Sequence, residues 1–298
     1  MKQTLFIISL VSSMLMACSQ TEKPTLAMNN TDSLIFEHNY ADVNGLKMYY
    51  ETYKPADHAD KGIPLLLIHG GGSTIQSTFE KVIPLFAKNR PVIAVEMQAH
   101  GRTSDRGADL TFEQDADDIA TLLNTLKINK ADFFGFSNGG TTTLQIAIRH
   151  PEIVNKIVLG SALARRSGVP EWFWGFMENA SLENMPVQLQ EAYLKVAPDP
   201  KGLQIMHDRD AKRMVNFKDI PDEQLKSIGV PTLIIIGDKD VITLEHALEL
   251  HRLIKNSELA IIPGGHGEYI GEVTTLKPDL KEHELIVPLI EKFLNKTE

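Results

Sequence analysis

Short apolar runs alternate with amphipathic helical patterns along most of this chain, and that alternation narrows its possible folds more than any other feature. The runs lie at 64–68, 91–96, 131–134, 156–160, 231–237 and 258–262. The run at 64–68 is continuously apolar, which is typical of a central strand that is covered on both faces. Since helical patterns follow most of the runs, we expect right-handed strand–helix–strand crossovers. The sequence therefore predicts an α/β fold class with a mostly parallel, doubly wound sheet.

Two stretches depart from this alternation. The segments 34–40 and 46–53 are rich in aromatic and β-branched residues and flank an Asn-Gly pair, which predicts an N-terminal β-hairpin. From 161 to about 229 no run of the buried-strand type occurs, and we expect a helical cap inserted over the strand ends. Both tryptophans of the chain, Trp172 and Trp174, lie in this insertion. We interpret them either as walls of a substrate pocket or as the core of the cap itself.

Composition indicates one sizeable domain, because 298 residues with 43% hydrophobic content can bury a single large core. The formal charge of −9 and the lack of a Lys/Arg cluster argue against a nucleic-acid partner. The sequence also lacks a metal-ligand spacing of His, Cys and Asp and lacks a dinucleotide fingerprint. We therefore expect a small-molecule substrate that is handled without a metal or cofactor.

The first residues form a segment of a different kind. Lys2 precedes an apolar run at 5–16 that is too short to span a membrane as a mature helix, which is typical of a signal peptide. The sequence Leu-Met-Ala-Cys at 15–18 resembles the lipobox of bacterial lipoproteins. That resemblance implies cleavage before Cys18 and lipid attachment to this residue. Cys18 is the only cysteine, so no intramolecular disulfide can form.

This interpretation divides the chain into a signal peptide at 1–17, a flexible polar tether at 18–33 and a folded domain at 34–298. It predicts an exported protein that is lipid-anchored to a bacterial membrane through Cys18. Ser19 stands where enterobacterial lipoproteins retained in the inner membrane carry aspartate. By that resemblance we expect the outer membrane, with the protein facing the periplasm.

A serine between two glycines follows the apolar run at 131–134. Gly135, Ser137 and Gly139 form a Gly-x-Ser-x-Gly pattern, and a helical pattern occupies 138–149. Strand, tight turn and helix in this order are the nucleophile elbow, in which a strained turn lifts the serine hydroxyl clear of the sheet. Glycine is needed on both sides because the packing leaves no room for side chains. The N–H of Asn138 then points toward a developing oxyanion.

Ser137 needs a base, because a hydroxyl is a poor nucleophile at neutral pH. His266 is the strongest candidate, since it lies in a glycine-rich loop after the last apolar run. His246 and His251 lie on a predicted helix, and we expect them at the surface.

The acid that orients the base should follow a strand between the serine and the histidine. Asp238 and Asp240 both come directly after the run at 231–237, and the spacing alone leaves both open. Glu171 in the cap is a further alternative.

From 34 to 295 the chain resembles the α/β-hydrolase superfamily, and most of all its single-cap esterases, lactonases and C–C bond hydrolases. The resemblance rests on motifs in the order typical of that family: His-Gly-Gly-Gly at 69–72, His-Gly-Arg-Thr-Ser at 100–104, the serine at 137, Gly-Asp-Lys-Asp at 237–240 and Gly-Gly-His-Gly at 264–267. In related sequences the acid lies three residues past the glycine. The resemblance therefore implies Asp240 as the acid and Asp238 as a turn residue.

The same resemblance implies roles for the loops. Gly71 supplies the second oxyanion-hole N–H beside Asn138, His69 positions that loop and His100 stabilises a turn. The sequence departs from its relatives at 96–98, where Glu-Met-Gln stands in place of an aspartate at the strand end. We expect this difference to reshape the pocket floor.

Together these residues predict a serine hydrolase of carboxylesterase type. Ser137 forms an acyl-enzyme, His266 transfers protons and Asp240 orients the imidazole. C–C bond hydrolysis, lactonase, amidase and cofactor-free perhydrolase activity stay open on the same triad. A lipid-anchored binding protein without activity is the alternative from another class, although no triad member is missing.

Overall fold

The computed structural model describes residues 34–56, 62–277, 279 and 281–297. The predicted signal peptide, the tether and Cys18 lie outside the described residues. Among the described helices, none has the length and apolarity needed to cross a bilayer.

Strands of a single sheet form the centre of the molecule, and they are β1 (Leu34–Val43), β2 (Leu46–Pro55), β3 (Leu65–Ile68), β4 (Val92–Val95), β5 (Ala131–Phe136), β6 (Val154–Gly160), β7 (Thr232–Gly237) and β8 (Ser257–Ile262).

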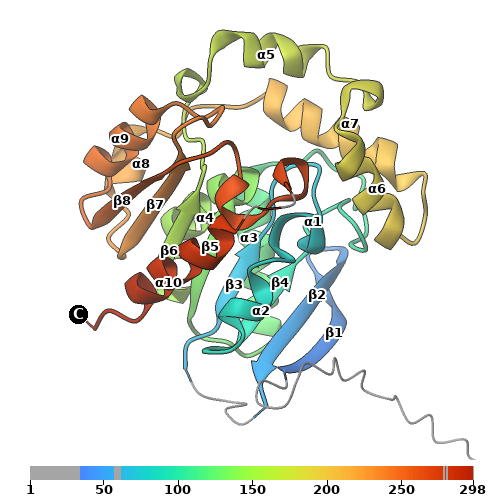
Figure 1. Cartoon of the computed structure of the whole chain (residues 1–298). Helices are drawn as coiled ribbons and strands as arrows, with labels where there is room; N and C mark the ends of the chain where they lie inside the picture. The colour runs from blue at the N-terminus through green and yellow to red at the C-terminus, as the bar shows by residue number, and fades with distance from the viewer. Residues whose placement is uncertain (1–33, 57–61, 278, 280, 298) are drawn as a thin grey trace, which may run out of the picture.

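The sheet has the strand order β1-β2-β4-β3-β5-β6-β7-β8. Strands β3 to β8 are parallel to one another, whereas β1 pairs antiparallel with β2, and β2 pairs antiparallel with β4. Asn44 and Gly45 join β1 to β2 with φ of 46° and 82°, as a tight two-residue hairpin turn requires. The predicted hairpin and the mostly parallel sheet are thus confirmed (Figure 1).

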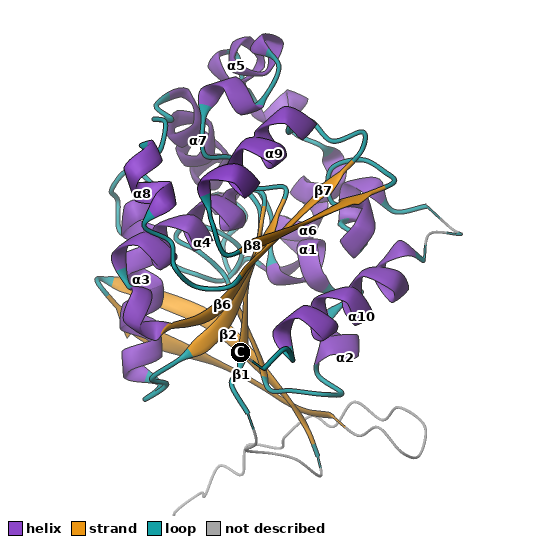
Figure 2. Ribbon diagram, turned by 90° about the vertical axis from the view of Figure 1, so that its left-hand side faces the viewer, coloured by secondary structure: helices purple, strands orange, loops and turns teal. Residues whose placement is uncertain are grey.

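Helices cover both faces of the sheet (Figure 2). Successive side chains of one strand point to opposite faces, so Leu66 and Ile68 lie in one apolar cluster while Leu65 and Leu67 lie in the other. Both faces are buried along β3 to β7, which explains why these strands are largely apolar, whereas the edge strand β8 is partly exposed and has no buried residue. The first face packs against α3 (Phe112–Thr125), α4 (Asn138–Arg149), α8 (Asp222–Lys226) and α9 (Leu244–Leu253), and the second against α1 (Ile75–Phe79), α2 (Ile83–Phe86) and α10 (Glu282–Leu294).

Between β6 and β7 the chain forms helices and no strand, and every residue of this stretch is described. Figure 1 shows α5 (Glu171–Glu178), α6 (Val187–Val196) and α7 (Gly202–Val215) above the sheet, and we call these three helices with their connections the cap. Helix α8 packs beside α4 and α9 instead. Tyr193, Leu203 and Met206 form a small apolar core under α6 and α7.

The sheet order brings the predicted site segments together. Strands β3, β5, β6, β7 and β8 are parallel neighbours, so their carboxyl ends meet at one edge. The loops that leave β3, β5, β7 and β8 at this edge carry 69–72, Ser137, 238–240 and 264–267.

Candidate active site

Ser137 lies in the turn between β5 and α4, and its backbone is strained. Its φ and ψ are 54° and −120°, a conformation that residues with side chains rarely adopt. The Ser137 N–H donates to the carbonyl of Gly160 at 2.8 Å, and the Ser137 carbonyl accepts the N–H of Gly140 at 2.8 Å. Strain of this kind costs about 1–3 kcal/mol and persists where the surrounding structure enforces it. The sheet and the helix therefore hold the hydroxyl beyond the strand end.

The flanking glycines allow this turn to form. A Cβ on Gly135 would collide with the Gly139 carbonyl and with the Thr143 hydroxyl. A Cβ on Gly139 would collide with the Ile68 carbonyl. Helix α4 thus packs directly on β3 and β5, and the serine at their junction cannot withdraw into the core.

His266 joins Ser137 to Asp240. Its Nε2 lies 3.0 Å from Ser137 Oγ, and its Nδ1 lies 2.7 Å from Asp240 Oδ1. Because a carboxylate only accepts hydrogen bonds, Nδ1 carries the proton and Nε2 accepts from the serine hydroxyl. The Phe136 ring packs against the imidazole with centroids 4.8 Å apart. Burial lowers the pKa of His266, but the Asp240 carboxylate outweighs burial and raises it above its usual value.

The protein supplies several donors to the Asp240 carboxylate. Besides His266, Oδ1 accepts the Ile242 N–H at 2.9 Å, and Oδ2 accepts the Ser161 hydroxyl at 2.6 Å. Since Ser161 uses its proton on Asp240, the hydroxyl of Tyr269, 2.8 Å away, donates to Ser161 Oγ. Burial alone would raise the pKa of Asp240, but His266 and these hydrogen bonds lower it. The carboxylate therefore stays ionised beside the imidazole.

Ser161 and Tyr269 are functional candidates that sequence reasoning missed. Their only signal is position, because Ser161 directly follows an apolar run and Tyr269 lies three residues after His266. Nothing in the local sequence pairs two hydroxyls that lie 108 residues apart.

The other predicted acids lie elsewhere. Asp238 is exposed, and its Oδ1 accepts the Gly264 N–H at 2.8 Å, as expected of a turn residue. Glu171 is exposed at the start of α5. His246 is buried, contrary to the expected surface position, and its Nε2 accepts the Ala164 N–H at 3.0 Å. The docking of α9 against the segment after β6 buries this ring, and helical periodicity does not reveal such docking.

Gly71 and Asn138, the predicted oxyanion-hole residues, lie against one another beside Ser137. A Cβ on Gly71 would collide with the Asn138 side-chain amide. The N–H of Asn138 belongs to the first turn of α4 and has no partner within the helix. Both backbone donors therefore lie within the same small region as the serine hydroxyl.

His69 sets the orientation of the loop before Gly71. Its Nε2 accepts the Met97 N–H at 3.1 Å, so Nδ1 carries the proton and donates to the Gly70 carbonyl at 2.7 Å. The Gly71 N–H belongs to the same planar peptide unit and therefore points away from the imidazole. Burial lowers the pKa of His69 to about 3, so the ring keeps this neutral tautomer.

A cavity of about 300 Å³ lies between the cap and the core residues Gly71, Ser137 and Asn138. Its walls are mostly apolar, and its lining residues are Gly71, Gly72, Ser137 and Asn138 from the core and Phe173, Phe176, Met177, Ala180, Asn184, Met185, Pro186, Leu189, Met206, His207, Asp210, Ala211 and Met214 from the cap. A space of this size and character suits a small, largely apolar molecule. Among the described residues, no group of three or more His, Cys, Asp or Glu side chains is arranged to hold a metal ion.

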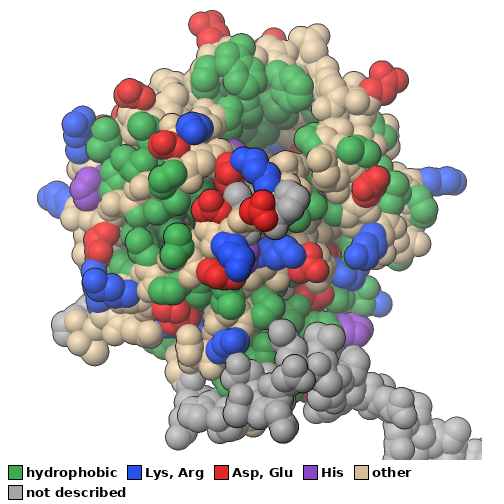
Figure 3. Space-filling view, viewed as in Figure 1, with side chains coloured by type: hydrophobic (Ala, Val, Ile, Leu, Met, Phe, Trp, Pro, Cys, Tyr) green, Lys and Arg blue, Asp and Glu red, His purple; other side chains and the backbone are tan. Residues whose placement is uncertain are grey.

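Trp172 and Trp174 do not line this cavity, and Phe173 and Phe176 take the place predicted for them. Trp172 is 63% exposed. Trp174 is buried, donates its N–H to the Arg166 carbonyl at 3.0 Å and belongs to the main core. Adjacent residues of a helix point about 100° apart, so the seating of α5 decides which of its aromatic residues face the cavity. The exposed side of the cap is also rich in hydrophobic side chains (Figure 3).

Asp210 on α7 is a further residue that sequence reasoning missed. It lines the cavity, and its Oδ2 accepts the Gly72 N–H at 2.6 Å. The same oxygen lies 2.8 Å from Nε2 of His100, the ring predicted to stabilise a turn. The cap therefore contacts the oxyanion loop directly.

Glu96 does not line the cavity, so the expected change to the pocket floor is absent. Its carboxylate lies under the 100–102 turn, where it accepts the Arg102 N–H at 2.6 Å and pairs with the Arg102 guanidinium at 2.5 Å. Burial raises the pKa of Glu96 to about 7, although Arg102 opposes this shift. The longer side chain supports the loop that carries His100 instead of shaping the pocket.

Known hydrolases are among the proteins to which this chain is similar. Over 220 residues, it is 29% identical to a pimeloyl-(acyl-carrier protein) methyl ester esterase from Neisseria meningitidis, covering 66% of this chain and 83% of that protein. Over 106 residues, it is 43% identical to a 2-hydroxymuconate semialdehyde hydrolase from a Pseudomonas species, covering 34% of this chain and 37% of the relative.

The fold is also that of solved hydrolases. The crystal structure of a serine hydrolase involved in carbazole degradation matches with a TM-score of 0.69 at 23% identity, covering 87% of this chain and 98% of that one. A sequence profile described as the alpha/beta hydrolase fold matches residues 63–221, more than half of this chain. The chain belongs to the alpha/beta hydrolase fold family.

Proposed function

We propose that this protein is a serine hydrolase that cleaves a carboxylic ester, or a related acyl bond, of a small molecule through an acyl-enzyme on Ser137. The observation that carries the proposal is the unbroken hydrogen-bond chain from Asp240 through His266 to Ser137 beside an apolar cavity. A serine hydroxyl that is held by a base, which is in turn oriented by a carboxylate, is the arrangement needed for nucleophilic catalysis.

The proposed mechanism uses these groups in two half-reactions. Ser137 Oγ attacks the substrate carbonyl while His266 Nε2 takes its proton, and the N–H groups of Gly71 and Asn138 stabilise the oxyanion. His266 then protonates the leaving alcohol, and the ester bond breaks to give the acyl-enzyme. Water attacks this intermediate with His266 as base, and Ser137 leaves with the proton.

The cavity supports a substrate with an apolar acyl or alcohol group. Phe173, Phe176 and Met177 of α5 and several further apolar cap residues line the same cavity as Ser137. The polar side chains of Asn184 and His207 offer a few points for orienting a ligand.

The 43% local identity with the 2-hydroxymuconate semialdehyde hydrolase supports a second candidate, hydrolysis of a C–C bond next to a carbonyl group. The same nucleophile, base and oxyanion donors would serve it, with a carbon leaving group in place of the alcohol. Lactones and amides are further substrates open to this chemistry.

Two measurements test the proposal. A fluorophosphonate probe should label the purified protein, whereas Ser137→Ala should stay unlabelled because only an activated serine reacts. A panel of esters, lactones, thioesters and a dienoic diketone should then give the highest kcat/KM with esters. A protein that does not label would belong to the non-catalytic binding class, and the highest kcat/KM with the diketone would favour the C–C hydrolase.

We also propose that the protein is exported and lipid-anchored through Cys18, on the outer membrane facing the periplasm. The proposal is supported by the apolar run at 5–16, the lipobox-like sequence at 15–18 and Ser19 after the cysteine.

A further inference from the structure

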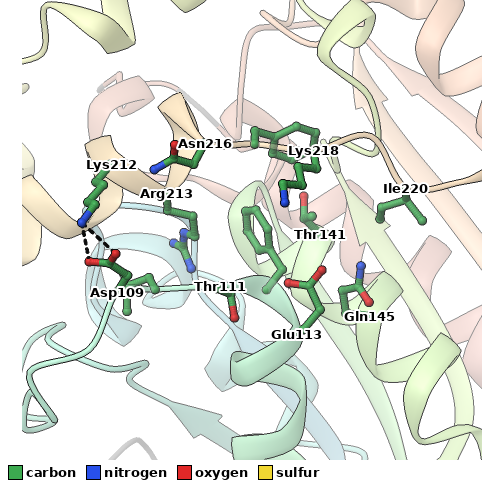
Figure 4. Close-up of a pocket in the computed structure, with 13 residues that line it drawn as sticks. Asp109, Thr111, Glu113, Thr141, Gln145, Lys212, Arg213, Asn216, Lys218 and Ile220 are labelled. Atoms are coloured by element: carbon green, nitrogen blue, oxygen red, sulfur yellow. Dashed lines mark hydrogen bonds and ion pairs between the residues drawn. The ribbon is translucent and has the colours of Figure 1, made fainter.

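Helix α7 is the cap element with the densest set of polar contacts to the core. Arg209 pairs with Asp105 at 2.7 Å, and Lys212 pairs with Asp109 at 2.7 Å. Figure 4 shows Lys212 reaching Asp109, with Arg213 directed from α7 toward the segment that begins α3. These contacts hold α7 on the 105–115 segment.

Asp210 extends this attachment to the loop beside the candidate nucleophile. Its Oδ2 accepts the Gly72 N–H at 2.6 Å, and Oδ1 accepts from the guanidinium of Arg213. The residue is only 7% exposed. The proposed acyl transfer does not by itself require a carboxylate at this position.

The protonation of His100 follows from its partners. Nδ1 faces the Gln98 carbonyl at 2.9 Å, and Nε2 faces the Asp210 carboxylate. Neither partner can donate, so both ring nitrogens carry protons. Burial lowers the pKa of His100, but Asp210 outweighs burial and raises it. Arg213 also pairs with Asp115 of α3 at 2.7 Å, so two basic and two acidic side chains form one buried chain between cap and core.

The bond from Gly72 to Asp210 bears on the oxyanion hole. The Gly72 N–H and the Gly71 carbonyl belong to one peptide unit, and the Ser73 hydroxyl donates to that carbonyl at 3.2 Å. On the other side of Gly71, His69 holds the peptide unit that carries the Gly71 N–H. With both flanking units held, the conformation of Gly71 is set, although glycine is intrinsically free to rotate.

We propose that Asp210 is a positioning residue that completes the oxyanion hole from the cap. With α7 docked, its carboxylate locks the 71–72 peptide unit, while His69 holds the 70–71 unit. The conformation of Gly71 is then fixed, and its N–H faces the carbonyl attacked by Ser137. This inference rests on the proposed acyl-transfer function. It implies that the oxyanion hole is aligned only when the cap is docked. A core with a displaced cap keeps its triad but loses the alignment of the Gly71 N–H.

The two ends of the locked peptide unit can be tested separately. Asp210→Asn keeps the shape but loses the charge, and Ser73→Ala removes one hydroxyl and spares the buried ion pairs. Removing an oxyanion-hole donor outright lowers kcat by about 10²–10³, so we expect each variant to lose about tenfold or more in kcat with KM changed less than about threefold. Because both residues act on one peptide unit, the double variant should lose much less than the product of the single losses.

A transition-state analogue gives a readout that a merely structural role would not move. A trifluoromethyl ketone forms a tetrahedral adduct with the serine, and its oxyanion occupies the hole. Its affinity should fall in Asp210→Asn and Ser73→Ala in parallel with kcat/KM. An unreactive alcohol of the same shape, which lacks the oxyanion, should bind all variants equally.

Arg209→Gln is the matched control, because it removes another contact between α7 and the core without touching the loop. We expect wild-type kcat for this variant, with folding of all variants checked by circular dichroism and thermal unfolding. Wild-type kcat in Asp210→Asn, a loss confined to KM, or an equal kcat loss in Arg209→Gln would overturn the inference. Should Asp210→Asn fail to fold, wild-type kcat in Ser73→Ala would overturn it. Full turnover in Ser137→Ala would instead contradict the proposed function.

Discussion

Asp240 and Asp238 lie two residues apart on one loop, yet only Asp240 contacts His266. We expect Asp240→Asn to lower kcat by about 10⁴, the loss seen when a serine-protease triad loses its aspartate, because the amide favours the wrong imidazole tautomer. Asp238→Asn should leave kcat within about threefold of wild type, since it changes a turn contact only. Steady-state kinetics with the best ester would measure both losses. Equal losses of kcat in the two variants would mean that the hydrogen bond between Asp240 and His266 is not the one that orients the imidazole in catalysis.

Glu96 predicts a distinctive pH dependence of stability. Its pKa rises from 4.5 to about 7 on folding, so between these values the folded state binds a proton that the unfolded state has lost. The free energy of unfolding should therefore fall as pH rises through this window, by up to about 1.4 kcal/mol per pH unit, and level off above it. Arg102 and Glu51 share this buried network, but burial is the largest cause of the shift.

Glu96→Gln cannot titrate and should lack this loss. Urea unfolding at several pH values between about 5 and 8 would give the free energy of each protein. We expect the difference in the free energy of unfolding, variant minus wild type, to rise by about 3 kcal/mol from acid to neutral pH, as a pKa shift of this size implies. A difference that stays constant across the window would show that Glu96 is ionised throughout.

At the scale of elements, helix α5 carries aromatic residues that line the cavity and others that do not. Phe176 lines the cavity, whereas Trp172, one helical turn earlier, is 63% exposed and does not. Phe176→Ala should change the ratio of kcat/KM between bulky and short-chain esters by about tenfold, because pocket contacts of this size are worth about 1–3 kcal/mol. Trp172→Ala should leave that ratio unchanged. A shift of the ratio by Trp172→Ala alone would mean that Trp172, and not Phe176, contacts the substrate.

For the whole molecule, the predicted anchor concerns residues outside those that the structure describes. Cys18→Ala should abolish incorporation of a fatty-acid analogue and leave the precursor unprocessed or release soluble protein, since the cysteine is the attachment point. Ser19→Ala is the matched control and should still incorporate the label. Membrane fractionation would then locate the wild-type protein. Incorporation that persists in Cys18→Ala would rule out this anchor.

Local constraints explain why much of the architecture could be predicted from the sequence alone. A strand buried on both faces must be apolar throughout, and the tight turn at Ser137 excludes side chains at Gly135 and Gly139. The hairpin likewise follows from two residues, Asn44 and Gly45, that tolerate positive φ. The hairpin turn depends on two neighbouring residues, whereas the constraint on Gly139 comes from Ile68 of another strand. Each of these constraints still demands a residue type that the sequence shows directly.

Contacts between distant segments could be read only from the tertiary structure. Asp210 meets Gly72 across 138 residues, and Ser161 meets Tyr269 across 108. Which aromatic residues of α5 face the cavity likewise depends on how the cap docks on the core, and His246 is buried by the docking of α9. The sequence thus determined the sheet, the elbow and the order of the triad candidates, because those depend on local sterics and periodicity. The tertiary structure alone decided the pocket wall and the cap contact with the oxyanion loop, because both depend on the angles at which whole helices pack.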